Sequence, residues 1–198
     1  MILTPHFLPC VRYCIEILKF ENVELDVNQT YTKQSYRNRA YILGANKVEA
    51  LIIPVHASSG KTLMKDVRVD NHSLWQKNQW KTIEAAYRKA PFYEHYDYLF
   101  QPSFEKKYNF LNDFLVDNLT SCLTALNVNK TLCLVENSQK ELNFDLNAKE
   151  RVKRDPDYQL YEYYQNFGNV FEPNLSILDM IFCIGPESRS HLEKSLLG

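Results

Sequence analysis

The stretch ILTPHFLPCVRYCIEILKFENVELDV, residues 2–27, decides the fold class of this chain. Its short apolar start ends at a Pro-His turn, after which Leu8, Val11, Ile15 and Leu18 recur at the three- and four-residue spacing of a helix packed on one face. In residues 21–27, valine and leucine alternate with acidic residues, which is the periodicity of a strand. Strand, helix and strand in this order form a β-α-β unit, which predicts an α/β fold.

The composition indicates an ordinary globular protein. A chain of 198 residues with 45% hydrophobic residues can bury one core, so we expect a single domain over residues 1–198. A formal net charge of −1 argues against a protein that coats nucleic acid or an anionic membrane. Arg12 and Glu16 interrupt the N-terminal apolar run, which is too short and too charged for a signal peptide or a membrane span. Five cysteines without framework spacing are read as reduced thiols, so we expect a cytoplasmic protein with no membrane insertion.

The rest of the chain adds strands and helices to this unit. Residues 35–55 predict two strands around a Gly44-Ala45-Asn46 turn, and residues 66–70 and 131–136 predict a short strand and a buried strand. Helices are expected from a Ser73 cap to Pro91 and from a Ser103 cap to Leu126. Together these elements predict a mixed β-sheet with several packed helices in the middle and C-terminal parts.

Two segments near the C-terminus have distinct patterns. Residues 146–158 are sharply polar and predict a mobile loop. The apolar run after Leu175 predicts a helix that ends at Gly185, with a further helix starting at Pro186.

A small basic cluster lies in YTKQSYRNR, residues 31–39. If the following residues form a strand, Arg37 and Arg39 share a face with Tyr41, about 7 Å apart, and repel each other unless an anion lies between them. Guanidinium groups bind phosphate or carboxylate bidentately, and Lys33 and Gln34 could close such a site. The alternative is a solvated edge paired with acidic side chains. Binding of single-stranded nucleic acid is disfavoured by the small size of the cluster.

His6 is a second candidate because it follows the first strand and precedes a helix. Ligand sites of open α/β sheets form at this position, where a histidine can contact a phosphate or act as a general base. A purely structural histidine is the alternative. His6, Cys10 and Cys14 are spaced by four residues, but no further ligand pattern accompanies them, so neither a metal site nor a cofactor is predicted.

Four blocks of the sequence resemble the WbqC-like protein family. They are TPHFLPCVRY (4–13), KQSYRNRAYILGAN (33–46) followed by IPV (53–55), WQKNQWKTIEAAYRKAPFYEHY (75–96) and PNLSILDMIFCIGPE (173–187). The resemblance covers essentially the whole chain. It implies acyl or aminoacyl transfer to the amine of a nucleotide-linked amino sugar in surface-polysaccharide metabolism.

The matching blocks select the candidate site residues. His6, Gln79 and Glu187 are the candidates for catalysis. The candidates for substrate binding are Tyr13, Lys33, Gln34, Arg37, Asn38, Arg39, Trp75, Asn174 and Asp179. Many relatives have a histidine where this chain has Gln79, so a mechanism that uses that histidine as base is not open to this protein.

The leading hypothesis is therefore an N-acyl or aminoacyl transferase acting on a small anionic substrate such as a sugar nucleotide. His6 would be the base, Asn38 or Gln79 would donate to the oxyanion, and Asp179 or Glu187 would hold the amine. A nucleotidyltransferase-like enzyme and a non-catalytic binding or scaffold protein are the alternatives. Oligomeric state, acceptor sugar and acyl donor are left open.

Overall fold

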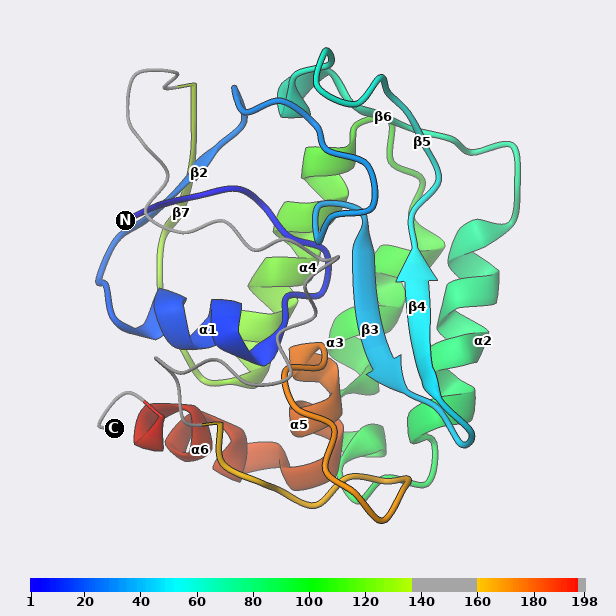
Figure 1. Cartoon of the computed structure of the whole chain (residues 1–198), viewed down its shortest axis with the longest axis vertical. Helices are drawn as coiled ribbons and strands as arrows, with labels where there is room; N and C mark the ends of the chain where they lie inside the picture. Colours follow the sequence, from blue (N-terminus) through cyan, green and yellow to red (C-terminus); the bar gives the residue numbers. More distant parts are fainter. Residues whose placement is uncertain (137–159, 196–198) are drawn as a thin grey trace.

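The computed structural model describes residues 1–136 and 160–195. A three-stranded parallel sheet lies on one side of the molecule and an antiparallel ribbon on the other, with helices beneath and behind them (Figure 1). The fold is α/β, as predicted. Within the described part of the chain, parallel and antiparallel pairs belong to three separate small sheets rather than to one mixed sheet.

The predicted β-α-β unit is confirmed. Strand β1 (Ile2–Leu3), helix α1 (Val11–Leu18) and strand β2 (Val23–Asp26) follow one another, and β1 pairs with β2 in parallel. Strand β7 (Leu132–Val135) lies on the other side of β2, which gives the strand order β1-β2-β7. Helix α1 begins three residues later than its apolar spacing suggests, because Leu8 has a positive φ of 38° and Cys10 forms a β-bridge with Ser176.

Two antiparallel pairs make up the remaining strands. β3 (Arg39–Leu43) and β4 (Val48–Ile52) flank the predicted turn, with Arg39 opposite Ile52. β5 (Val55–His56) pairs with β6 (Arg68–Val69), just after the 3₁₀ turn η1 (Met64–Asp66). The three strands that the sequence predicts in residues 35–70 are therefore all present.

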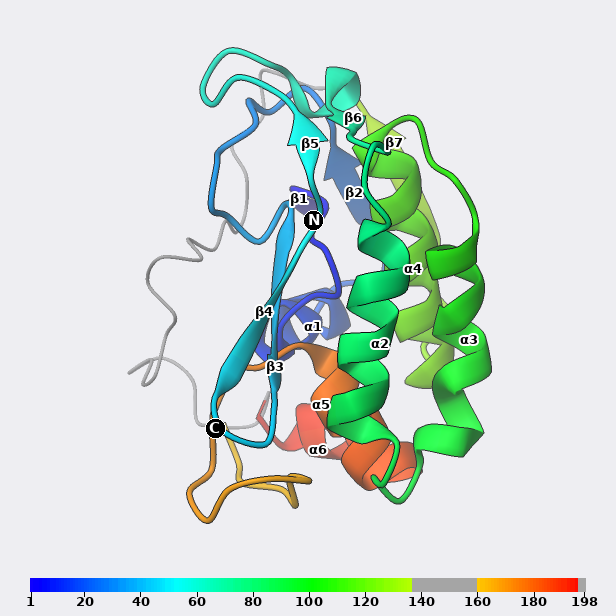
Figure 2. The same cartoon turned by 90° about the vertical axis from the view of Figure 1, so that its right-hand side faces the viewer.

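Helices α2 (Trp75–Tyr87), α3 (Tyr93–Glu105) and α4 (Leu111–Ala125) stack side by side behind the strands (Figure 2). The prediction of one helix from Ser103 to Leu126 is wrong, since Ser103 lies inside α3 and a new helix begins at Leu111. The intervening residues pair with the β6 region instead: the Val69 amide donates to the Asn109 carbonyl at 3.0 Å, and the Leu111 amide donates to the Val67 carbonyl at 2.9 Å. The Ser73 cap is also wrong, because Leu74 occupies the N-cap position of α2 without a side-chain cap.

The C-terminal helices follow the prediction more closely. α5 (Ile177–Ile184) ends at Gly185, whose φ is 51°, and the 3₁₀ turn η2 (Gly185–Glu187) leads into α6 (Ser188–Lys194). Strand β7 was expected to be buried, but Cys133 is exposed and Leu134 is 50% exposed, because among the described residues β7 pairs on one side only, with β2. The loop predicted at residues 146–158 lies outside the described residues.

One hydrophobic cluster extends from Leu3 in β1 to Leu192 in α6 and includes side chains of every long helix. The cysteines are free thiols, and four of them are buried in this cluster. Among the described residues, no helix combines the length and the apolar character needed to span a membrane.

Candidate functional site

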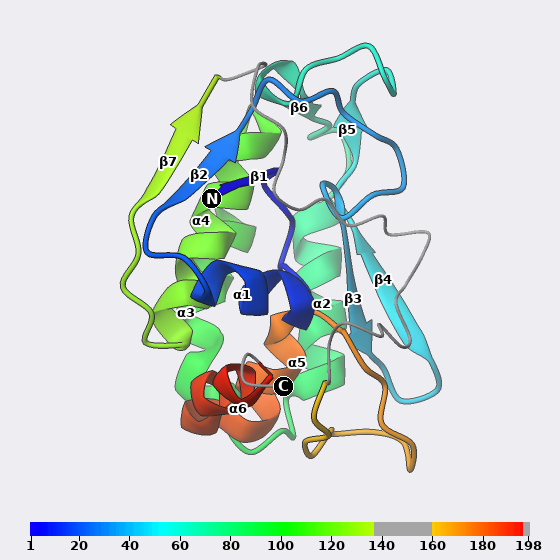
Figure 3. The same cartoon turned by 60° about the vertical axis from the view of Figure 1, so that its left-hand side comes forward.

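His6 lies in the segment that joins β1 to α1. This segment crosses the middle of the molecule, between the parallel sheet and the β3–β4 ribbon (Figure 3). The His6 ring is 1% exposed and stacks between two tyrosines, with ring centroids 4.4 Å from Tyr13 and 5.6 Å from Tyr36. These two stacked contacts restrict the orientation of the imidazole ring.

The tyrosines on either side of His6 are themselves fixed. The Tyr13 hydroxyl donates to the Thr4 carbonyl at 2.9 Å, which ties α1 to the end of β1. The Phe7 amide donates to the Tyr36 carbonyl at 2.9 Å, and the Tyr36 ring meets the edge of the Tyr41 ring at 5.9 Å. These contacts join the β1–α1 segment to the loop that carries the basic cluster.

The two arginines of that cluster do not alternate along one strand as predicted. Residues 35–38 form a turn, in which the Asn38 amide donates to the Ser35 carbonyl at 3.3 Å, and β3 starts only at Arg39. Arg37 is consequently buried, with 5% exposure, rather than displayed on a sheet face. Tyr36 precedes β3 and contacts Tyr41, which the strand prediction had placed on the opposite face.

Both arginines nevertheless act on one hydroxyl group, that of Tyr31. Burial raises the pKa of Tyr31, and the positive charges of Arg39 and Arg37 oppose that rise. Nε of Arg39 is buried and has no hydrogen-bond partner among residues 1–136 and 160–195.

Lys33 and Gln34 lie on the same loop but point to solvent. Both residues are exposed, and Gln34 adopts a positive φ of 58°. The Lys33 amide donates to Ser59 Oγ at 3.1 Å, which attaches this part of the loop to residues 58–62. These two side chains can reach a ligand only from the outer side of the loop.

Asn38 and Gln79 are both bound to the end of β4. Asn38 Nδ2 donates to the Ile53 carbonyl at 3.0 Å, and Gln79 Nε2 donates to the Ile52 carbonyl at 2.9 Å. Their amide oxygens are buried without a hydrogen-bond partner in the described part of the chain. One N–H of each amide is thus used to hold α2 and the basic loop against β4.

Asp179 lies in the core and is fully buried. Its carboxylate accepts hydrogen bonds from the hydroxyls of Tyr87 and Tyr163, both at 2.8 Å, and from Gln165 Nε2 at 2.9 Å. Burial raises the pKa of Asp179, and these three hydrogen bonds oppose the rise. The carboxylate joins α5 to α2 and to the segment that precedes α5.

The other predicted residues are spread over the molecule. Trp75 is buried at the start of α2, with its ring edge-on to Phe114 at 5.2 Å. Asn174 has a positive φ of 54°, and its Oδ1 accepts from the Arg12 amide at 3.0 Å, so it caps the start of α1. Glu187 is exposed on η2.

The cysteines next to His6 have the character of core thiols. Burial raises the pKa of Cys10 to about 11 and the pKa of Cys14 well above its ordinary value. Since the thiolate is the form that attacks electrophiles and binds metals, both side chains are inert near neutral pH.

Sequence reasoning missed Tyr31 and Tyr36 as members of this region. Both lie within the quoted stretch 31–39. A strand pattern, however, predicts only the face on which the Tyr36 side chain lies, and it predicts no role for Tyr31. The available signal was the frequency of tyrosine around the basic residues, which does not indicate which ring stacks on His6.

Comparison with known proteins supports one assignment. The chain matches the model of the WbqC-like protein family over residues 4–155 and 153–191. Neither the curated proteins nor the solved structures contain a significant match. The family match includes the β1–α1 segment that carries His6, the basic loop that carries the arginines, and α5 with Asp179. The chain therefore belongs to the WbqC-like protein family.

Proposed function

We propose that this protein binds the phosphate groups of a sugar nucleotide at Arg37 and Arg39 and transfers an acyl or aminoacyl group to an amine of the sugar. The observation that carries the proposal is that Arg37 is buried, while Arg39 at the start of β3 has a buried Nε without a hydrogen-bond partner among residues 1–136 and 160–195. A guanidinium group whose N–H donors are withdrawn from water gains from an anion that accepts hydrogen bonds from them. Phosphate or pyrophosphate matches the fork-shaped donors of arginine.

His6 is the proposed base. In acyl transfer, the amine loses a proton and attacks the carbonyl of an activated acyl donor, and the leaving group takes up a proton as the tetrahedral intermediate collapses. An imidazole can accept that proton near neutral pH. The stacking of His6 on Tyr13 and Tyr36 supports this role, since a base must be held in a defined orientation toward the amine.

Asn38 and Gln79 are proposed to stabilise the oxyanion with the second N–H of each amide, while the first stays on β4. Asp179 is proposed to position rather than react, because three hydrogen bonds from its own chain already occupy its oxygens. The family resemblance supports an amino sugar of surface-polysaccharide metabolism as the acceptor.

The binding step is tested by calorimetric titration of a UDP-linked amino sugar and of pyrophosphate. We expect Arg39→Gln to weaken binding at least tenfold, because a charge-assisted hydrogen bond contributes about 1.5 to 3 kcal/mol. The double variant Arg37→Gln/Arg39→Gln should weaken it further. Arg88→Gln removes an exposed arginine from the end of α2 and is the matched control.

The catalytic step is tested separately with His6→Asn. This variant should bind the sugar nucleotide as the wild type does and lose N-acylation, followed by mass spectrometry with thioester, adenylate and aminoacyl-tRNA donors. If Arg39→Gln binds every tested anion as tightly as the wild type, the proposed arginine site is contradicted. Tight binding without transfer from any donor would identify a binding protein instead.

A further inference from the structure

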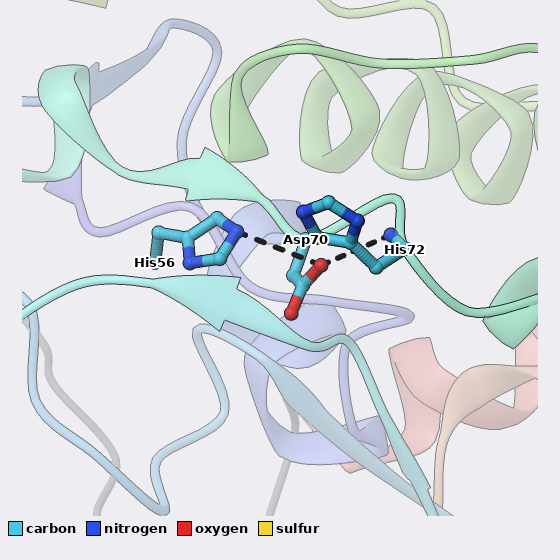
Figure 4. Close-up of side chains that lie close together, drawn as sticks. All are labelled: His56, Asp70 and His72. Atoms are coloured by element: carbon cyan, nitrogen blue, oxygen red, sulfur yellow. Dashed lines mark hydrogen bonds and ion pairs between the residues drawn. The ribbon is translucent and has the colours of Figure 1, made fainter.

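We propose that His56, Asp70 and His72 form a binding site for a divalent transition-metal ion such as zinc. Among the described residues, these three form a group of possible metal ligands whose donor atoms all lie within 4.8 Å of one another. Figure 4 shows the two imidazole rings beside the Asp70 carboxylate, His56 coming from β5 and His72 from the turn that leads toward α2. Two imidazoles and one carboxylate are a common ligand set for zinc and related ions.

The β5–β6 pair places His56 and Asp70 on one face. His56 is directly opposite Arg68 in the register, and Asp70 follows Arg68 by two residues, so all three side chains lie on the same side of the ribbon. The pairing continues past β6, since the Asp70 amide donates to the Pro54 carbonyl at 2.9 Å. The Arg68 guanidinium packs over the Phe110 ring at 4.8 Å, which holds its positive charge against that ring.

A tight turn returns His72 to the same carboxylate. The His72 amide donates to Asp70 Oδ1 at 3.0 Å, and Asn71 Nδ2 donates to the Tyr108 carbonyl at 2.8 Å. The turn is thus anchored to the segment between α3 and α4. Because the backbone of all three ligands is fixed by hydrogen bonds, only side-chain rotations are needed to enclose an ion.

The donor separation suits a shared ion better than a direct hydrogen bond. His56 Nε2 lies 3.5 Å from Asp70 Oδ1, beyond the usual length of an N–H···O bond. Two ligands of a tetrahedral zinc ion, with bonds of about 2.0 to 2.1 Å, are about 3.4 Å apart. His56 and His72 are exposed and Asp70 is half-buried, so an ion can reach the three side chains from solvent.

The site would keep one coordination position free, and one of its ligands borders a cleft. His72 also lines a hollow of about 700 Å³ between α2 and α3, together with Leu74, Lys77, Trp80 and Phe104. Three protein ligands leave a fourth position for water or for an oxygen atom of a bound molecule. The free position could therefore take the oxygen of a carboxylate or hydroxamate ligand.

The test uses protein without a histidine tag and with Cys133→Ser, because Cys133 is the exposed thiol. We expect one Zn²⁺ per chain by calorimetry and a Co²⁺ absorption spectrum typical of tetrahedral coordination. His56→Asn, Asp70→Asn and His72→Asn should each weaken binding at least tenfold, whereas His95→Asn, which removes an exposed histidine of α3, should leave it unchanged.

Equal Zn²⁺ affinity in the double variant His56→Asn/His72→Asn and in the wild type would overturn the site. Acetohydroxamate should change the Co²⁺ spectrum of the wild type, and an unchanged spectrum would overturn the open position. The site shares no residue with the proposed arginine site, so its failure leaves the sugar-nucleotide test intact.

Discussion

At the scale of single residues, burial decides what a polar side chain can do. Asp179 and Arg37 were both predicted to bind substrate, but one is fully buried and the other is 5% exposed. A buried carboxylate requires partners, and Asp179 has three. Asp179 therefore contributes first of all to the stability of the folded protein.

Asp179→Ala should lower the free energy of unfolding by about 3 kcal/mol, because it leaves three buried donors without their acceptor. Asp113→Ala, which removes an exposed aspartate from α4, should cost less than about 1 kcal/mol. Urea unfolding measures both, and equal losses would contradict the assigned role.

The pH dependence of stability gives a second test of Asp179. Burial raises the pKa of this carboxyl above its ordinary 3.8, so the folded protein holds the proton more tightly than the unfolded chain. Its contribution to stability is complete below 3.8 and is lost as pH rises through the raised pKa. The free energy of unfolding of the wild type minus that of Asp179→Asn should therefore fall as pH rises above 3.8. A difference that increases with pH would show that the hydrogen bonds outweigh burial.

At the scale of elements, the junctions determine how helices and strands meet. Between α5 and α6, Gly185 has a φ of 51°, and a Cβ at this position would lie 2.5 Å from the Phe92 ring. The junction thus needs glycine both for its backbone conformation and for the close approach of the segment before α3.

Gly185→Ala should lower the free energy of unfolding by about 3 kcal/mol, since backbone strain and steric overlap add. Gly60→Ala is the matched control, because Gly60 has a φ of 73° with no atom within 4 Å of the added Cβ, so only strain of about 1 kcal/mol is expected. In the double variant Gly185→Ala/Phe92→Ala, the part of the lost free energy of unfolding that comes from steric overlap should be recovered. Additive losses in that double variant would contradict the contact.

At the scale of the whole molecule, one hydrophobic cluster connects the elements. Cys14 in α1, Cys122 in α4 and Cys183 in α5 are buried in it, whereas Cys133 on β7 is exposed. Burial also raises the pKa of Cys122 and Cys183, so these thiols stay protonated in the folded protein.

One thiol, Cys133, should react rapidly with an aromatic disulfide reagent in the native protein. In Cys133→Ser, the remaining four should become reactive together, at the denaturant concentration where helical circular dichroism is lost, if the chain is the single domain that its length predicts. If Cys10 and Cys14 are labelled at a lower denaturant concentration than Cys122 and Cys183, the N-terminal unit unfolds separately from the helical part.

Local periodicity was sufficient for much of this fold. The β-α-β unit, the β3–β4 hairpin and the Gly185 helix end follow from apolar spacing and turn residues, because these signals act within a few positions of each other. The same signals failed at residues 106–110, where the apolar spacing continues but backbone groups pair with the segment around β6. A hydrogen bond between segments forty residues apart leaves no periodic trace in either of them.

The sequence by itself determined the fold class, the family and the position of His6 after the first strand. The tertiary structure alone decided that Arg37 is buried in a turn, that Tyr36 stacks on His6, and that His56 meets Asp70 and His72. Each of these depends on the register and direction of segments that come together only when the chain folds, which residue types and spacing do not specify.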